Sequence, residues 1–110
     1  ENLNKILNLK RIENKNLSKV ICNLVRSNDV HYLHIHDKQQ VCLYYVNLDW
    51  RDGWHGETLF YNPDNLSEIV YTSLYMSGRI ILFDGSIPHA IRPQSVKAPK
   101  FRITLSLFFD

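Results

Sequence analysis

The chain has 110 residues, of which 45% are hydrophobic and 22% are charged, and this composition excludes a disordered, collagen-like or coiled-coil protein. Thirteen Lys and Arg residues against eleven Asp and Glu residues give a formal net charge of +2, which does not favour nucleic acid or a membrane surface as a partner. Two cysteines are too few for a disulfide framework, and there is no secretory signal or apolar run of about 18 residues, so we expect one intracellular, cytoplasmic domain.

The first 30 residues predict a helical segment that lies outside the core. Apolar residues recur at helical spacing in two groups, which are Leu3, Ile6 and Leu7, and then Leu17, Val20, Ile21, Leu24 and Val25. The polar run 13–16 separates the two groups. We therefore expect one or two short amphipathic helices that cover one face of a sheet.

Residues 31–110 predict a β-rich core. Runs of β-branched and aromatic residues, each of strand length, occupy 41–48, 58–61, 68–71, 79–83 and 102–109. Turn signals such as Asp52-Gly53, Ser77-Gly78 and Asp84-Gly85 separate the runs. Short strands at close spacing favour an all-β sandwich or barrel.

Three of the five histidines form a candidate metal site. His34 and His36 stand two residues apart on an extended segment, so both side chains point to the same face. His89 follows a buried-looking strand and the rigid Pro88, where a scaffold can hold a ligand in place. Two histidines from one segment and one from a distant strand can bind a transition metal, although a single histidine is more often structural.

Arg102 and Thr104 lie on the same face of the last predicted strand and could bind a carboxylate together. The phenol of Tyr45 could add a third donor. The alternatives are an Arg102 that is a solvated cation and a Tyr45 that packs in the core.

Several segments between residues 31 and 109 carry a family resemblance when they are taken in order. They are His34-x-His36, Leu43 to Asn47 with Asp49-Trp50, 54–61, 78–85, Ile87-Pro88-His89 and 101–105. This set resembles the C-terminal catalytic part of an Fe(II)/2-oxoglutarate-dependent dioxygenase of the prolyl 4-hydroxylase-like superfamily. The resemblance implies a double-stranded β-helix, or jelly roll, with helices packed outside and a metal at one mouth of the barrel.

The resemblance also implies roles for individual residues. His34 matches the first metal-binding histidine of the family, and His89 matches the distal one. Arg102 matches the arginine that binds the far carboxylate of 2-oxoglutarate, while Thr104 and Tyr45 match residues that support it.

The sequence departs from the family pattern at the second metal ligand. The family has an Asp where this chain has His36, and an Asp follows one place later as Asp37. Strand alternation favours a catalytic metal site of His34, His36 and His89. An anionic ligand would hold Fe(II) better, which keeps Asp37 as the alternative to His36.

The implied reaction hydroxylates an unactivated C–H bond of a protein prolyl or small-molecule substrate. O₂ and 2-oxoglutarate are consumed, succinate and CO₂ are released, and ascorbate is a candidate supporting reductant. The rival hypotheses are a cofactor-free dioxygenase of the cupin type, with a three-histidine metal site, and a non-enzymatic jelly-roll binding domain that has lost the iron. The sequence specifies no oligomeric state.

The length of the chain also bears on the resemblance. The stretch from His34 to Arg102 contains the whole predicted site, whereas relatives usually carry more strands and helices before the first ligand. The chain is thus expected to be either a minimal version of the family or an N-terminally truncated fragment, and the first residue, Glu1 rather than Met, favours a fragment.

Overall fold

A computed structural model describes residues 10–110, so the predicted helix around residues 3–7 lies outside the described residues. One short 3₁₀ helix, η1, is followed by seven strands. Their bounds are η1 Lys10–Ile12, β1 Leu17–Val25, β2 Gln40–Tyr45, β3 Thr58–Asn62, β4 Asn65–Ser73, β5 Ile80–Asp84, β6 His89–Ile91 and β7 Arg102–Phe109. Within residues 10–110, no helix has the length and apolar character needed to cross a membrane.

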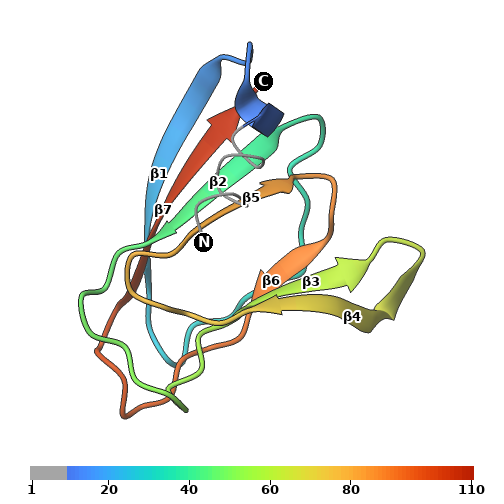
Figure 1. The fold of residues 1–110 in the computed structure, drawn as a ribbon. Coiled ribbons are helices and arrows are strands. Elements are labelled where there is room, and N and C mark those ends of the chain that lie inside the picture. Colours follow the sequence, from blue (N-terminus) through green and yellow to red (C-terminus); the bar gives the residue numbers. More distant parts are fainter. Residues whose placement is uncertain (1–9) are drawn as a thin grey trace.

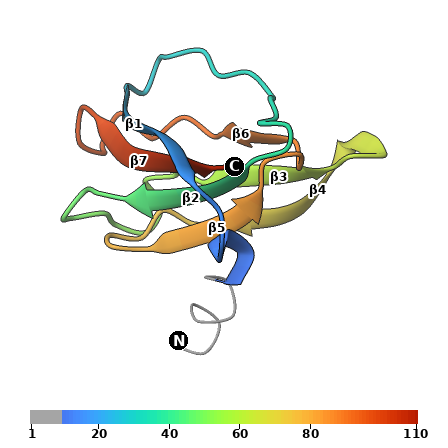
Figure 2. The same cartoon turned by 90° about the horizontal axis from the view of Figure 1, so that it is seen from above.

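The strands form two antiparallel sheets (Figure 1). The four-stranded sheet has the order β1-β7-β2-β5, and the three-stranded sheet has the order β4-β3-β6. Seen from above, β3, β4 and β6 lie behind the four-stranded sheet (Figure 2). The prediction of a mainly β protein is therefore confirmed.

Alternating burial on the central strands shows where the core lies. In β2 the buried positions are Val41, Leu43 and Tyr45, and in β7 every second residue from Arg102 to Phe108 is buried. Phe60 of β3 contacts Phe83 of β5, with ring centroids 4.8 Å apart. The core therefore lies between the two sheets, as expected for a sandwich or barrel.

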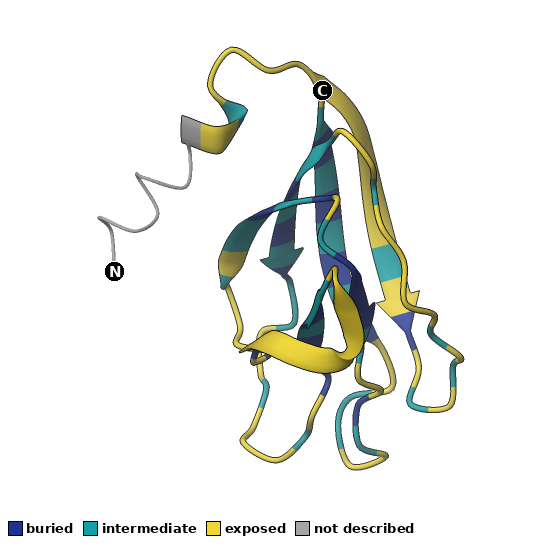
Figure 3. Ribbon diagram, turned by 90° about the vertical axis from the view of Figure 1, so that its right-hand side faces the viewer, coloured by how far each residue is buried: buried dark blue, intermediate teal, exposed yellow. Residues whose placement is uncertain are grey.

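The prediction of a helix over residues 17–25 is wrong, because this segment is β1 and pairs with β7 along its length. Leu17, Val20 and Leu24 follow helical spacing but are all more than half exposed. Figure 3 shows β1 and β4 in yellow, as strands whose residues are mostly exposed. Among residues 10–110, no α-helix covers either sheet.

The five predicted strands are all present, and all but the last have changed ends. The run 41–48 forms β2 but ends at Tyr45, and the run 68–71 is the middle of the longer β4. The last run begins and ends as predicted, at Arg102 and Phe109. The short strand β6, which starts at His89, was not predicted.

Candidate metal centre

The structure brings His34, His36 and His89 together. His34 lies in the loop between β1 and β2, and its backbone pairs with that of His89 at the start of β6 through two N–H···O bonds of 3.0 Å. One potential ligand nitrogen from each histidine lies within 4.8 Å of those of the other two. The backbone bridge thus holds together two residues that are far apart in sequence.

Hydrogen bonds fix the orientation of two of these rings. Nδ1 of His34 donates to the carbonyl oxygen of Tyr32 at 2.9 Å, and Nδ1 of His89 donates to that of Ile87 at 2.8 Å. A carbonyl oxygen can only accept, so the proton of each neutral ring is on Nδ1 and Nε2 carries the free lone pair. Metal-binding histidines usually make such a bond with the nitrogen that does not face the metal.

The surroundings favour the neutral form of His36 and of His89. Burial, followed by the charges of His34 and His36, lowers the pKa of His89 to about 4, although its bond to Ile87 opposes this. Burial also lowers the pKa of His36, with smaller contributions from His34 and Lys19. A metal binds the neutral form of histidine, so both rings are available as ligands near neutral pH.

Gly85 sets the position of His36. The backbone N–H of His36 donates to the carbonyl oxygen of Gly85 at 2.7 Å, and that of Gly85 donates to the carbonyl oxygen of Gln39 at 2.8 Å. A Cβ atom at Gly85 would overlap the carbonyl oxygen of His36. Asp37 is exposed and is not part of the histidine group.

The three histidines line a cavity of about 160 Å³ between the two sheets. Its polar wall consists of Asn23, Thr58, Arg102, Thr104 and Ser106. The other lining residues are Ile21, Val41, Leu43, Phe83, Ile91 and Phe108, and no Asp or Glu among residues 10–110 lines the cavity. The cavity thus combines possible metal ligands with hydrogen-bond donors and one permanent positive charge.

Arg102 is fully buried beside this cavity. Its Nε donates to the carbonyl oxygen of Gly56 at 2.7 Å, and its Nη2 donates to Oγ1 of Thr58 at 3.2 Å. Its Nη1 is buried and has no hydrogen-bond partner, and no salt bridge to Arg102 forms within residues 10–110. Burial lowers the pKa of Arg102, while Tyr45, Tyr75 and Glu57 act in the opposite direction.

Tyr45 is not on the cavity wall. Its hydroxyl lies 2.8 Å from Oγ1 of Thr58 and donates to Oγ of Ser73 at 3.0 Å, and the residue is completely buried. Arg102 and Tyr45 therefore meet through Thr58, which the sequence did not single out. Thr104, in contrast, lines the cavity together with Arg102.

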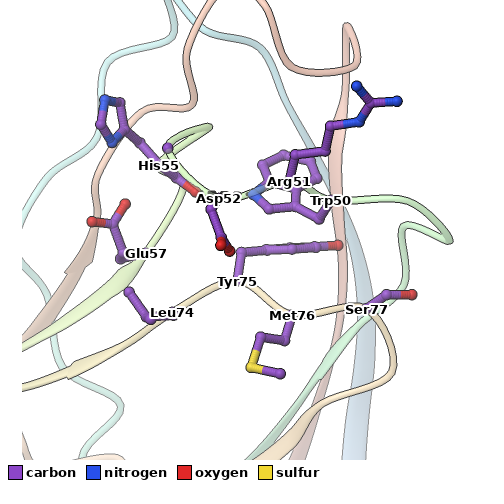
Figure 4. Close-up of a pocket in the computed structure, with 10 residues that line it drawn as sticks. Trp50, Arg51, Asp52, His55, Glu57, Leu74, Tyr75, Met76 and Ser77 are labelled. Atoms are coloured by element: carbon purple, nitrogen blue, oxygen red, sulfur yellow. Dashed lines mark hydrogen bonds between the residues drawn. The ribbon is translucent and has the colours of Figure 1, made fainter.

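A larger hollow of about 470 Å³ contains none of the three histidines (Figure 4). The ring of Tyr75 lies between this hollow and Arg102, with its centroid 5.1 Å from the guanidinium carbon. Tyr75 stacks on Tyr45 at 4.5 Å and contacts Trp50 at 4.2 Å. The smaller cavity is therefore the one that is lined by the three-histidine group, and the ring of Tyr75 lies between the larger hollow and Arg102.

Asn23 and Ser106 are cavity residues that sequence reasoning missed. Asn23 lies in the segment that was predicted to be helical, so no inward face was assigned to it. Ser106 could have been found, because it continues the alternation that places Arg102 and Thr104 on one face of β7.

No protein-family model matches this chain, and no curated protein matches it. The assignment of a function therefore depends on the residues of this chain and on their geometry.

Proposed function

We propose that this chain is an Fe(II)- and 2-oxoglutarate-dependent dioxygenase that hydroxylates an unactivated C–H bond of a protein prolyl or small-molecule substrate. One observation carries the proposal. The His34, His36 and His89 group and the unpartnered Nη1 of Arg102 belong to residues that line the same cavity.

The histidine group fits a transition metal. Imidazole nitrogens bind Fe(II) as well as Zn(II), Cu(II) and Ni(II), and the two oriented rings present Nε2 lone pairs. When bound, Fe(II) would supply the redox chemistry by which O₂ oxidises 2-oxoglutarate to succinate and CO₂ and hydroxylates the substrate. The chain itself contributes neutral ligands, because the pKa values of His36 and His89 are lowered.

The buried guanidinium of Arg102 fits the carboxylate of a co-substrate. A buried cation without an anion is unfavourable by several kcal/mol, whereas a carboxylate would neutralise it and accept a charge-assisted hydrogen bond. Nη1 is the atom left to donate, because Nε and Nη2 are already bonded to Gly56 and Thr58. Phe83 and Phe108 supply an apolar wall that limits the access of water.

The proposal includes a jelly-roll fold for this chain. From β2 to β7 the chain crosses repeatedly between the two sheets, since β2, β5 and β7 belong to one sheet and the hairpin β3–β4 and β6 belong to the other. Such repeated crossing suits a jelly roll.

Succinate formation tests the activity without knowledge of the prime substrate. The chain would be incubated with Fe(II), ascorbate and 2-oxoglutarate, with and without proline-containing peptides, and succinate would be measured by mass spectrometry. We expect slow uncoupled turnover that depends on iron. Metal binding without turnover and without 2-oxoglutarate binding would support the cofactor-free cupin-type alternative instead.

A pair of neighbouring variants tests the second metal ligand. We expect His36→Ala to reduce metal affinity by about 10-fold or more, because it removes one of three ligands, while Asp37→Ala retains the metal. Metal content after gel filtration would be measured by elemental analysis, with circular dichroism as the folding control. Metal loss in Asp37→Ala alone would show that the carboxylate is the ligand.

A further inference from the structure

Asn23 places a polar side chain of the edge strand β1 on the wall of the cavity. Its register partner in β7 is Thr104. Alternation along β1 puts Asn23 on the same face as Ile21, which also lines the cavity, and Val25, which is buried. The neighbouring Cys22 is exposed.

The amide of Asn23 connects two hydroxyl groups of β7. Its Nδ2 donates to Oγ1 of Thr104 at 3.2 Å and to Oγ of Ser106 at 3.0 Å. A primary amide has two N–H donors, so one goes to each hydroxyl. Each hydroxyl oxygen therefore accepts one hydrogen bond, and its O–H group is still free to donate one. Among residues 10–110 neither hydroxyl has another hydrogen-bond partner.

The groups on the cavity wall indicate what kind of ligand could accept hydrogen bonds from these two hydroxyls. Thr104 and Ser106 are only 1% and 7% exposed, so bulk water does not readily accept hydrogen bonds from their hydroxyl groups. The same wall carries the unpartnered Nη1 of Arg102, and no acidic side chain from the described part of the chain lines it. A wall of donors without a negative charge suits an anion that extends past Arg102 toward the histidines.

We propose that Asn23 is a positioning residue of the co-substrate site. Its amide donates a hydrogen bond to the oxygen of each hydroxyl, which leaves the O–H groups of Thr104 and Ser106 to donate hydrogen bonds to the dianion 2-oxoglutarate. This inference rests on the proposed function and adds a role for β1 to it. Asn23 acts on the ligand through the two hydroxyls and is not a catalytic residue.

An Asn23→Asp variant tests the orientation directly. The introduced carboxylate can only accept hydrogen bonds, so both hydroxyls would donate to it and not to the ligand. The carboxylate would also place a negative charge beside the ligand. Binding of 2-oxoglutarate to the chain loaded with Mn(II), which replaces iron without turnover, would be measured by calorimetry. We expect the Kd to rise by about 10-fold or more in Asn23→Asp, and by about 3- to 10-fold in Asn23→Ala.

Cys22→Asp is the matched control, because it adds the same charge to the same strand on the outer face. We expect it to leave the Kd for 2-oxoglutarate unchanged. In turnover assays, Asn23→Ala should raise the KM for 2-oxoglutarate while kcat at saturation stays close to that of the wild type. Thermal unfolding of the ligand-free proteins identifies any variant that does not fold.

Two outcomes would overturn the inference, and they differ in what they say about the proposed function. Equal 2-oxoglutarate affinity in folded wild type, Asn23→Ala and Asn23→Asp would refute the role of Asn23 and leave the dioxygenase proposal standing. Absence of 2-oxoglutarate binding by the Mn(II)-loaded wild type would overturn both. Weakened binding in both Asn23 variants, with a normal Cys22→Asp, would support the inference even if the prime substrate is unknown.

Discussion

Replacement of Gly85 by Ala tests whether the backbone around the histidines builds the metal site. The added Cβ would overlap the carbonyl oxygen of His36 and would lie 2.9 Å from the carbonyl oxygen of Gln39. Both neighbours are backbone atoms, so rotation of a side chain cannot relieve the overlap. The segment that carries His36 must therefore move away from β5.

The size of the effect follows from the two hydrogen bonds that join these segments. The bonds from His36 to Gly85 and from Gly85 to Gln39, at 2.7 and 2.8 Å, would both lengthen. Overpacking of this kind costs about 1–3 kcal/mol of unfolding free energy. Because metal affinity depends on the position of each ligand, displacement of His36 should weaken metal binding by about 10- to 100-fold.

Gly53→Ala is the matched control for this prediction. Gly53 has φ +84°, and no atom of residues 10–110 lies within 4 Å of the place that a Cβ would take, so Ala there is strained in the backbone but meets no described neighbour. We expect Gly53→Ala to lower stability by about 1 kcal/mol and to keep the metal affinity. Urea unfolding and titration with Mn(II) or Zn(II) would measure the two quantities. Equal metal affinity in both variants would refute the reasoning.

Two further substitutions separate ligand binding from stability. Arg102→Met should weaken 2-oxoglutarate binding about 10-fold or more. It should lower the unfolding free energy of the ligand-free chain by less than about 1 kcal/mol, because it removes a buried charge that has no counterion. Urea unfolding with and without 2-oxoglutarate checks both effects. Tyr45→Phe should cost about 1–2 kcal/mol of stability, because Thr58 and Ser73 lose a buried partner. Its calorimetric Kd for 2-oxoglutarate should change by less than about 3-fold, and a larger change would place the phenol on the ligand.

The strands of the core could be predicted because their alternation is visible in the sequence. In β2, the inward residues Val41, Leu43 and Tyr45 are apolar or aromatic and sit among β-branched and aromatic neighbours. β1 lacks this pattern, because one of its inward residues is the polar Asn23 and its outward residues include Val20 and Leu24. An edge strand with apolar residues on both faces resembles an amphipathic helix when only spacing is read.

The site could be predicted in part, for a similar reason. The spacing of His34 and His36 requires only local alternation, whereas their meeting with His89 depends on the bridge between the 34–36 segment and β6. The sequence places Tyr45 near the carboxylate because it is a phenol in the strand after the histidine pair and matches a tyrosine of the family. Its actual partners, Thr58 and Ser73, come from β3 and β4, and no local pattern reveals them.

The inward face of β7 is the strongest physical reason to expect a ligand here. A chain of 110 residues has a modest core, yet Arg102, Thr104 and Ser106 give three of its central inward positions to polar groups. Apolar residues at these positions would stabilise the fold more, so the polar face is unfavourable for the empty protein. A bound dianion reverses this balance, since a ligand at 100 times its Kd adds about 2.7 kcal/mol to the stability of the folded state. Thermal stability should therefore rise with 2-oxoglutarate in the metal-loaded wild type, and at the same ligand concentration it should rise clearly less in Arg102→Met.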